Sequence, residues 1–248
     1  MARTLLVTGG SRGIGAAICR LGAVRGYDVA IVYNRQRDSA DAVARDVEAA
    51  GRRSAVIQAD TTDADQIARM FDETETQLGK VDAFVSNSGI IHVGQPLADI
   101  PLETIRSVID TDLTAHIIAN REAVRRMGRS RGGKGGAIVN ISSMAASLFG
   151  AGGFIPYGSA KGGIDVLTQG LGREAASDGI RVNAVRPGLI DTDMQRDTGI
   201  DDRIGRFGPQ VPIGRSGTAD EVAEAVIWLL SDHASYVTGT IFDVSGGR

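Results

Sequence analysis

Residues 4–15 read TLLVTGGSRGIG, a short apolar run followed directly by a glycine-rich turn. Thr4–Thr8 is predicted to be a β-strand, and a helix is predicted after the turn. Glycine is needed where the backbone turns tightly and where a phosphate group approaches the main chain. A helix N-terminus then offers free N–H groups to an anion. The spacing Gly-x3-Gly-x-Gly differs from the usual G-x-G-x-x-G, so a purely structural turn is the alternative to a phosphate-binding turn.

The alternation of strand and helix continues along the whole chain. Short runs rich in Val and Ile suit a parallel sheet that is buried on both faces. The predicted strands are Thr4–Thr8, Asp28–Tyr33, Ser54–Ala59, Asp82–Ser86, Gly136–Ser142, Arg181–Arg186 and Thr240–Val244. Amphipathic helices are predicted at Arg37–Ala50, Asp63–Leu78 and Asp220–Leu230. We therefore expect an α/β fold, a single Rossmann-type, doubly wound parallel seven-stranded sheet with helices on both faces.

Length and composition narrow the class of protein further. The 248 residues suit a single domain at 1–248, and the net charge of -3 gives no reason to expect a nucleic acid or an anionic membrane as partner. No apolar run of about 18 residues is present, so we expect no membrane span. Cys19 is the only cysteine, which favours a cytoplasmic location. The three histidines lack metal-ligand spacing, so no metal is expected.

The end of the second predicted strand should contact the adenosine ribose of a dinucleotide. NAD-binding proteins often place an acidic residue about 20 positions past the glycines, where it binds the ribose 2′-hydroxyl. Arg35 stands there, after Asn34, and Asp38 comes only after the expected turn. Arg35 and Arg12 can instead form a fork around a 2′-phosphate. This pattern favours NADP(H), with NAD(H) as the alternative if both arginines are merely solvated.

Tyr157 and Lys161 lie four residues apart in a segment predicted to be helical, so their side chains share one helical face. A free tyrosine has a pKa of about 10, and a neighbouring ammonium group lowers that pKa by favouring the phenolate. Such a tyrosine can exchange a proton with an alcohol or an alkoxide. Ser142 and Ser143 end a central strand, where α/β sheets bind ligands, and a serine hydroxyl there can hydrogen-bond a substrate oxygen.

Together these motifs resemble the short-chain dehydrogenase/reductase family, and the resemblance covers essentially the whole chain. They are TGGSRGIG at Thr8–Gly15, QAD at Gln58–Asp60, SNSG at Ser86–Gly89, IVNISS at Ile138–Ser143, YGSAK at Tyr157–Lys161, IRVNAVRPG at Ile180–Gly188 and SYVTG at Ser235–Gly239. Within the family the chain is most similar to bacterial 3-oxoacyl reductase-like and sugar or alcohol dehydrogenase-like members.

The resemblance implies a role for each matching position. Tyr157 would be the acid/base, Lys161 would lower its pKa and hold the nicotinamide ribose, and Ser143 would orient the substrate in preference to Ser142. Asp60 would meet the adenine ring. The implied cofactor-binding residues are Gly9, Ser11, Arg12, Gly13, Ile14, Gly15, Asn34, Arg35, Asp60, Thr61, Asn87, Ser88, Gly89, Tyr157, Lys161, Pro187, Gly188, Ile190 and Thr192.

The chain departs from the family pattern at two places. Ser86–Gly89 reads SNSG where the family usually has NNAG, a change that we expect the loop to tolerate. Asp112 stands where the family usually has an Asn that holds a water in a proton relay to the lysine. An aspartate can still hold this water, but its charge near Lys161 would weaken the effect of the lysine on Tyr157. We expect Asp112 to belong to the catalytic set and to retune the relay without abolishing it.

The sequence thus predicts an enzyme that transfers a hydride between NADP(H) and a carbonyl or secondary alcohol carbon of a small molecule. The alternatives are an NAD(P)-dependent sugar or polyol dehydrogenase and a non-catalytic dinucleotide sensor, and the retained Tyr157 and Lys161 argue against the sensor. Reduction of a substrate on an acyl carrier protein would need a basic patch, for which Arg125, Arg126 and Arg129 are candidates.

The resemblance also implies a mobile substrate lid at about 191–213 and a homotetramer. In such a tetramer, helices Leu102–Met127 and Tyr157–Ser177 would pair across one two-fold axis. Helix Asp220–Leu230 and strand Thr240–Val244 would pair across another axis.

Overall fold

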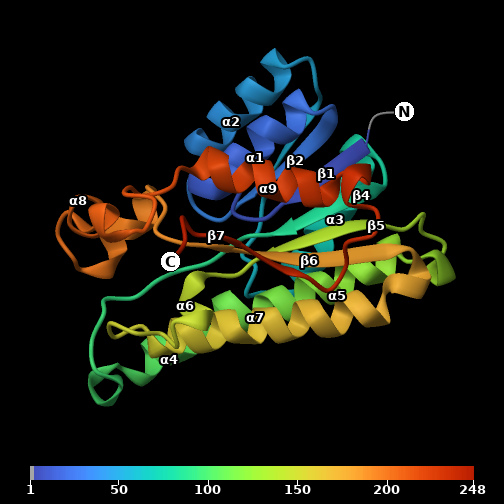
Figure 1. Ribbon diagram of the computed structural model, residues 1–248. Helices are drawn as coiled ribbons and strands as arrows, with labels where there is room; N and C mark the ends of the chain where they lie inside the picture. The colour runs from blue at the N-terminus through green and yellow to red at the C-terminus, as the bar shows by residue number, and fades with distance from the viewer. Residues whose placement is uncertain (1–2) are drawn as a thin grey trace.

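The first strand of the chain lies in the middle of a seven-stranded sheet. In the computed structural model, which describes residues 3–248, the strand order is β3-β2-β1-β4-β5-β6-β7 and every neighbouring pair is parallel (Figure 1). The strands are β1 (Arg3–Val7), β2 (Tyr27–Tyr33), β3 (Ser54–Gln58), β4 (Val81–Ser86), β5 (Gly136–Ile141), β6 (Ile180–Pro187) and β7 (Ile241–Val244). The predicted Rossmann-type sheet is confirmed, and each predicted strand is present with ends that differ by at most one residue.

Helices cover both faces of this sheet (Figure 1). One face carries α1 (Gly13–Val24), α2 (Arg37–Ala49) and α9 (Ala219–Leu230). The other face carries α3 (Ala64–Leu78), α5 (Ala115–Met127) and α7 (Ile155–Glu174). Successive residues of β1 serve opposite faces, because Leu5 packs in the core under α1, α2 and α9, and Leu6 in the core under α3 and α5. This double burial explains why the strands are apolar throughout.

The remaining elements are short. Three further α-helices are α4 (Leu102–Ile109), α6 (Met144–Ser147) and α8 (Arg203–Phe207). The 3₁₀ turns are η1 (Leu97–Asp99), η3 (Arg129–Arg131), η4 (Ala176–Asp178), η5 (Asp193–Thr198), η6 (Gly208–Gln210) and η7 (Asp232–Ala234). Helix α8 belongs to the orange segment at the left of Figure 1, and it lies away from the sheet. Within residues 3–248, no helix has the length and apolar character needed to cross a membrane.

Side-chain caps set where two of the predicted helices begin. The Asp63 carboxylate accepts hydrogen bonds from the N–H groups of Asp65 and Gln66, so α3 begins at Ala64. At α9, Thr218 and Glu221 form a reciprocal capping box. Because these caps satisfy backbone N–H groups that have no partner within the helix, both helix starts are fixed by local sequence.

The predicted helix Leu102–Met127 is present without a gap, but it contains a π-helical turn, η2 (Asp110–Thr114), between α4 and α5. Inside this turn the Asp112 side chain is fully buried and accepts a hydrogen bond from the N–H of Ile90. A π-turn adds one residue to a helical turn and is frequent at functional sites. The π-turn thus accompanies a tertiary contact of Asp112, which the local sequence pattern did not predict.

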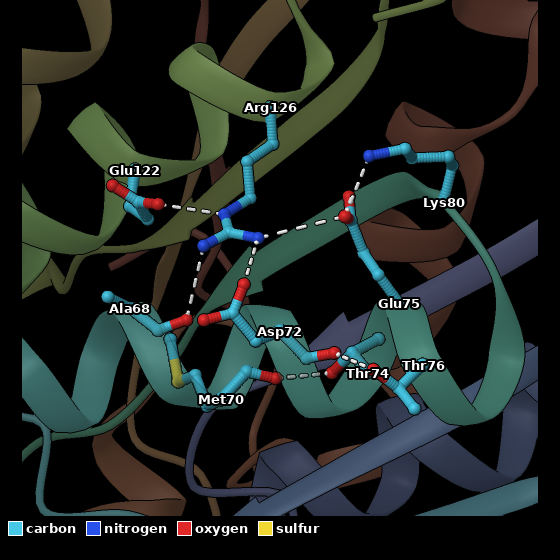
Figure 2. A network of polar contacts seen from close by, with 9 residues as sticks. All are labelled: Ala68, Met70, Asp72, Thr74, Glu75, Thr76, Lys80, Glu122 and Arg126. Carbon is cyan, nitrogen blue, oxygen red and sulfur yellow. Dashed lines mark hydrogen bonds and ion pairs between the residues drawn. The ribbon is translucent and has the colours of Figure 1, made fainter.

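An ionic network holds α5 against α3. Figure 2 shows the Arg126 guanidinium of α5 between carboxylates of both helices. Its nitrogens lie 2.8 Å from Glu122 on the same helix, 2.8 Å from Asp72 on α3 and 3.7 Å from Glu75 on α3. The Lys80 ammonium lies 2.8 Å from the same oxygen of Glu75, Oε2. Because Arg126, Glu122 and Glu75 are each less than one-fifth exposed, this network is screened less than a surface ion pair.

Candidate active site

The glycine turn between β1 and α1 is shaped by close backbone packing. Gly9 and Gly13 adopt positive φ angles of 63° and 53°, which glycine reaches without strain. A Cβ atom on Gly15 would overlap the carbonyl oxygen of Gly9 and lie 2.7 Å from the Asn87 side-chain nitrogen. Over Gly13 the nearest atom to such a Cβ is 3.5 Å away, on Thr192. The turn therefore leaves the main chain at the start of α1 open to an anion, and it fits a dinucleotide phosphate.

Residues after β4 hold this turn in place. Asn87 donates from its side-chain amide to the carbonyl oxygens of Thr8, at 2.8 Å, and Gly9, at 3.2 Å. The Thr8 hydroxyl accepts in return from the N–H groups of Asn87 and Ser88. The two loops at the centre of the sheet, one from β1 and one from β4, thus form one hydrogen-bonded unit at the point where the strand order reverses. Ligands of open α/β sheets bind at such a point.

A buried histidine holds the loop after β4 through two hydrogen bonds. His116 on α5 lies within hydrogen-bond distance of the Ser86 hydroxyl through Nδ1, at 2.9 Å, and of the Ser88 carbonyl oxygen through Nε2, at 2.8 Å. Burial lowers the pKa of His116 to about 3, so the ring is neutral and donates from Nε2. The sequence pattern gave no signal for this role, because the contact joins a helix face to a distant loop.

One cavity of about 890 Å³ runs over the carboxyl ends of the strands and joins both loops to the segments after β2, β5 and β6. All of the predicted cofactor-binding residues line this cavity. Ser143, Tyr157 and Lys161 line it as well, together with Arg203 and Arg248. Asp112 is the one predicted site residue that does not line it.

Arg12 and Arg35 line the part of the cavity that follows β1 and β2. Both side chains are exposed, and within residues 3–248 neither makes an ion pair or a side-chain hydrogen bond. Arg37, two residues further on, is paired with Asp41 instead. Asp60 also lines the cavity, and hydrogen bonds from the N–H and hydroxyl of Thr62 keep its pKa below the usual range. Among residues 3–248, the two arginines on this side of the cavity are thus not paired with a carboxylate.

Tyr157 and Lys161 lie on the inner face of α7, as their spacing predicts. The Lys161 ammonium lies 5.6 Å from the centre of the Tyr157 ring and donates to the carbonyl oxygen of Ile141, at 3.1 Å. Both side chains are buried. Burial raises the pKa of Tyr157, and the charge of Lys161 is the largest influence that lowers it.

The two serines at the end of β5 have different surroundings. Ser142 is buried, and its hydroxyl donates to the carbonyl oxygen of Lys161, at 3.1 Å. Ser143 caps α6 by accepting from the N–H of Ala145, at 3.1 Å, and it helps to lower the pKa of Tyr157. The Ser143 hydroxyl thus lies next to Tyr157 at the cavity, whereas the Ser142 hydroxyl is engaged by the backbone of α7.

Asp112 lies behind Lys161. Its Oδ1 atom is 3.4 Å from the Lys161 ammonium, and the N–H of Ile90 donates to the same carboxylate. Burial raises the pKa of Asp112 to about 6, against the opposing charge of Lys161. The charge of Asp112 in turn raises the pKa of Tyr157. The residues stand in the order Asp112, Lys161, Tyr157, and only the last two face the cavity.

Comparison with known proteins agrees with this geometry. The chain matches the family model described as "Enoyl-(Acyl carrier protein) reductase" over residues 9–248. It is 44% identical over 243 residues to the uncharacterized oxidoreductase YgfF of Escherichia coli (strain K12), which covers 98% of each chain. It is 40% identical to a cis-4-hydroxycyclohexanecarboxylate dehydrogenase of Sinomonas cyclohexanicum, over 99% of this chain and 96% of that one. A 3-oxoacyl-[acyl-carrier-protein] reductase FabG of Staphylococcus aureus (strain Mu50) is 38% identical, over 100% and 98% of the two chains.

Solved structures show the same relationship. A dehydrogenase/reductase from Sinorhizobium meliloti 1021 superposes with a TM-score of 0.91 at 35% identity, over 100% of this chain and 95% of that one. A blue fluorescent protein from a metagenomic library, in complex with NADPH, gives 0.89 at 35% identity, over 99% and 97%. The chain belongs to the short-chain dehydrogenase/reductase family. It is an NAD(P)-dependent oxidoreductase of alcohol or carbonyl groups.

Proposed function

We propose that this protein transfers a hydride between NADP(H) and a carbonyl or secondary alcohol carbon of a small molecule, with Tyr157 as the acid/base. The proposal rests on one observation, that the same cavity joins the glycine turn after β1 to Ser143, Tyr157 and Lys161. A nicotinamide dinucleotide supplies or accepts the hydride when it is bound. The chain itself has to hold the dinucleotide, orient the substrate oxygen and move one proton.

Three side chains are suited to the proton and the substrate oxygen. During reduction, the Tyr157 hydroxyl donates its proton to the oxygen that gains negative charge, and during oxidation the phenolate takes the proton back. The positive charge of Lys161 favours the phenolate and opposes the effect of burial on the pKa of Tyr157. The Ser143 hydroxyl donates a hydrogen bond to the same substrate oxygen and fixes its position.

The two arginines near the adenosine side support NADP(H) over NAD(H). A ribose 2′-phosphate carries negative charge and presents oxygens in a geometry that guanidinium groups match. Arg12 and Arg35 have no protein carboxylate to pair with among residues 3–248. No acidic side chain from the end of β2 lines the cavity, where an NAD-binding protein would hold the 2′-hydroxyl. The structurally similar protein in complex with NADPH adds to this support.

A small molecule is favoured over a substrate carried on acyl carrier protein, although some relatives are named as acyl-carrier-protein reductases. Such a partner would need a basic patch. Arg126, one of the three candidates for it, is already engaged by Glu122, Asp72 and Glu75 (Figure 2).

The lid, the oligomer and the location belong to the same proposal. We propose that residues 191–213 form the substrate lid of a single domain, since the segment consists of short helical turns and contributes Asp193, Met194, Gln195 and Arg203 to the cavity lining. A homotetramer would cover exposed apolar side chains such as Val166 on α7 and Trp228 on α9. A cytoplasmic location is part of the proposal as well.

Titration with NADPH and with NADH, followed by nicotinamide fluorescence, tests the cofactor. We expect NADPH to bind about tenfold tighter or more, which corresponds to about 1.4 kcal/mol. Equal or tighter binding of NADH would overturn the preference and direct substrate screening to oxidation of sugars and polyols with NAD. A screen of ketones and aldehydes with NADPH tests the reaction. Tyr157→Phe should lower kcat by about 10²–10⁴-fold and leave NADPH binding within about threefold.

A further inference from the structure

Two arginines that the proposed hydride transfer does not use lie in the same cavity as Tyr157. Arg203 is on α8, and Arg248 follows β7. Arg203 is half-buried, and its pKa is lowered first by burial and then by the neighbouring charge of Arg248. It is also near enough to Tyr157 for each charge to act on the pKa of the other. Two cations therefore face the part of the cavity where a substrate would meet Tyr157.

Neighbouring side chains hold Arg203 in a defined position. Its guanidinium carbon lies 5.2 Å from the centre of the Phe154 ring, and its Nη1 donates to the Gln195 side-chain oxygen at 3.0 Å. Phe154 is itself buried and packs with Tyr157 in one apolar cluster. Among residues 3–248 no other hydrogen bond is made by the guanidinium, so Nε and Nη2 are left as one edge of the planar group. That edge matches the two oxygens of a carboxylate.

No side-chain carboxylate of residues 3–248 lies within ion-pair distance of Arg203 or Arg248. Besides Asp60, which lies after β3, the aspartates Asp193 and Asp197 line the same cavity. Asp193 is paired with Arg196 at 3.2 Å, and Asp197 is exposed. Holding two like charges together in a partly desolvated cavity costs free energy, and a bound anion would offset this cost.

We propose that Arg203, assisted by Arg248, is an anion subsite for the substrate, and that the substrate is a hydroxy or oxo compound that carries a carboxylate. The carboxylate would lie on the free edge of Arg203, with the apolar part of the substrate against Phe154 and the reacting oxygen at Tyr157. This inference rests on the proposed function for the position of the reacting oxygen. The anion subsite itself depends only on the arginines.

Calorimetry can test the subsite without turnover. Cyclohexanecarboxylate and its neutral analogue cyclohexanecarboxamide would be titrated into the protein saturated with NADP⁺. We expect the acid to bind about tenfold tighter or more than the amide, because a charge-assisted bidentate pair replaces a neutral hydrogen bond. In Arg203→Met this preference should fall to within about twofold. Arg203→Lys should retain part of it, because the charge remains and the planar fork is lost.

Arg206→Met is the matched control, since Arg206 is exposed on the same helix and does not line the cavity. It should leave the preference for the acid unchanged. A wild-type protein that binds acid and amide equally, or an Arg203→Met variant that keeps the full preference, would overturn the anion subsite. Thermal melting of each variant confirms that it is folded.

Turnover separates the two proposals. Oxidation of 4-hydroxycyclohexanecarboxylate and of its methyl ester would be followed with NADP⁺, in the wild type and in Tyr157→Phe. In the wild type we expect kcat/KM to be about tenfold higher or more for the acid than for the ester. In Arg203→Met this advantage of the acid should be lost, whereas kcat/KM for the ester should change little. If acid and ester turned over equally, the subsite would be wrong and the hydride transfer would stand. If Tyr157→Phe turned over as fast as the wild type, the proposed role of Tyr157 would fail, whatever the binding data showed.

Discussion

The carboxylate of Asp112 lies 3.4 Å from the ammonium of Lys161, and both side chains are buried. The pair is completed by the N–H of Ile90 on one side and the carbonyl oxygen of Ile141 on the other. The charge of Lys161 therefore acts both on Asp112 and on Tyr157, whose ring centre is 5.6 Å away. An ionised Asp112 weakens the influence of Lys161 on the pKa of Tyr157.

Replacing Asp112 with Asn should move the pH dependence of alcohol oxidation. The variant removes a negative charge that raises the pKa of Tyr157, so the phenolate forms at lower pH. We expect the apparent pKa of kcat/KM to fall by about half to one unit. Asp110→Asn is a suitable control, because Asp110 is exposed on the same turn. An unmoved profile in Asp112→Asn would show that Asp112 has no effect on Tyr157.

The same substitution should change how stability depends on pH. Burial raises the pKa of Asp112 from its ordinary value of 3.8 to about 6, so between these pH values the folded protein binds a proton that the unfolded chain has lost. The contribution of Asp112 to stability is thus full below about pH 4 and declines as the pH rises to about 6. The amide of the Asp112→Asn variant cannot titrate. As the pH rises across this window, urea unfolding should show the free energy of unfolding of the variant increasing by about 2 kcal/mol relative to that of the wild type. If the difference in free energy of unfolding between variant and wild type stayed constant from pH 4 to 7, the raised pKa of Asp112 would be contradicted.

Arg35→Ala should weaken NADPH binding selectively. Loss of a charge-assisted contact to the 2′-phosphate should raise the Kd for NADPH by about 10–100-fold and leave that for NADH within about threefold. The matched control is Arg37→Ala, since Arg37 is exposed, paired with Asp41 and absent from the cavity lining. Fluorescence titration measures both constants. Equal losses for NADPH and NADH in Arg35→Ala would argue against a 2′-phosphate contact.

Gly15→Ala should disable the dinucleotide site. The added methyl group would overlap the carbonyl oxygen of Gly9 and crowd the Asn87 side chain, so the turn has to shift. We expect the Kd for NADPH to rise by about 100-fold. At Gly170 on α7 no atom lies within 4 Å of such a methyl group, and Gly170→Ala should leave dinucleotide binding unchanged. Wild-type affinity in Gly15→Ala would show that the close packing at the turn is dispensable.

Arg126→Met should destabilise the fold without affecting the site. The substitution leaves Glu122 and Glu75, both mostly buried, without their common partner, and we expect a loss of about 2 kcal/mol (Figure 2). Arg45→Met on the exposed side of α2 should stay within about 0.5 kcal/mol of the wild type. Urea unfolding measures both variants. A change below about 0.5 kcal/mol for Arg126→Met would mean that the network contributes no more than a surface pair.

The sequence allowed prediction of those features that local pattern controls. Strands such as Val29–Val32 are apolar on both faces because helices cover both faces, so their place in a parallel sheet could be predicted. The turn at Thr8–Gly15 and the pair Tyr157 and Lys161 follow from backbone geometry over a few residues. Their common cavity agrees with the prediction, and their chemical roles stay predictions.

The features that were missed depend on contacts between distant segments. The π-turn at Asp110–Thr114 accompanies contacts of Asp112 with Ile90 and Lys161, which no helical period reveals. Arg203 looks like any polar residue of a short surface helix. Arg248 reaches the cavity only because β7 pairs with β6. Charged residues are common outside the core, so nothing in the local sequence distinguished these two from solvated ones.

The adjacency of β1 and β4 has a consequence for how the chain matures during synthesis. Thr8 is among the first residues made, yet Asn87, which is 79 positions later, supplies the side chain that holds its carbonyl oxygen. A nascent chain that ends before β4 lacks this support as well as the hydrogen bond from Thr8 to Val85. Such non-local pairing is slow to form. We therefore expect the glycine turn after β1 to acquire its shape only once β4 has been made, and a dinucleotide to act as a ligand for folding only from that stage onward.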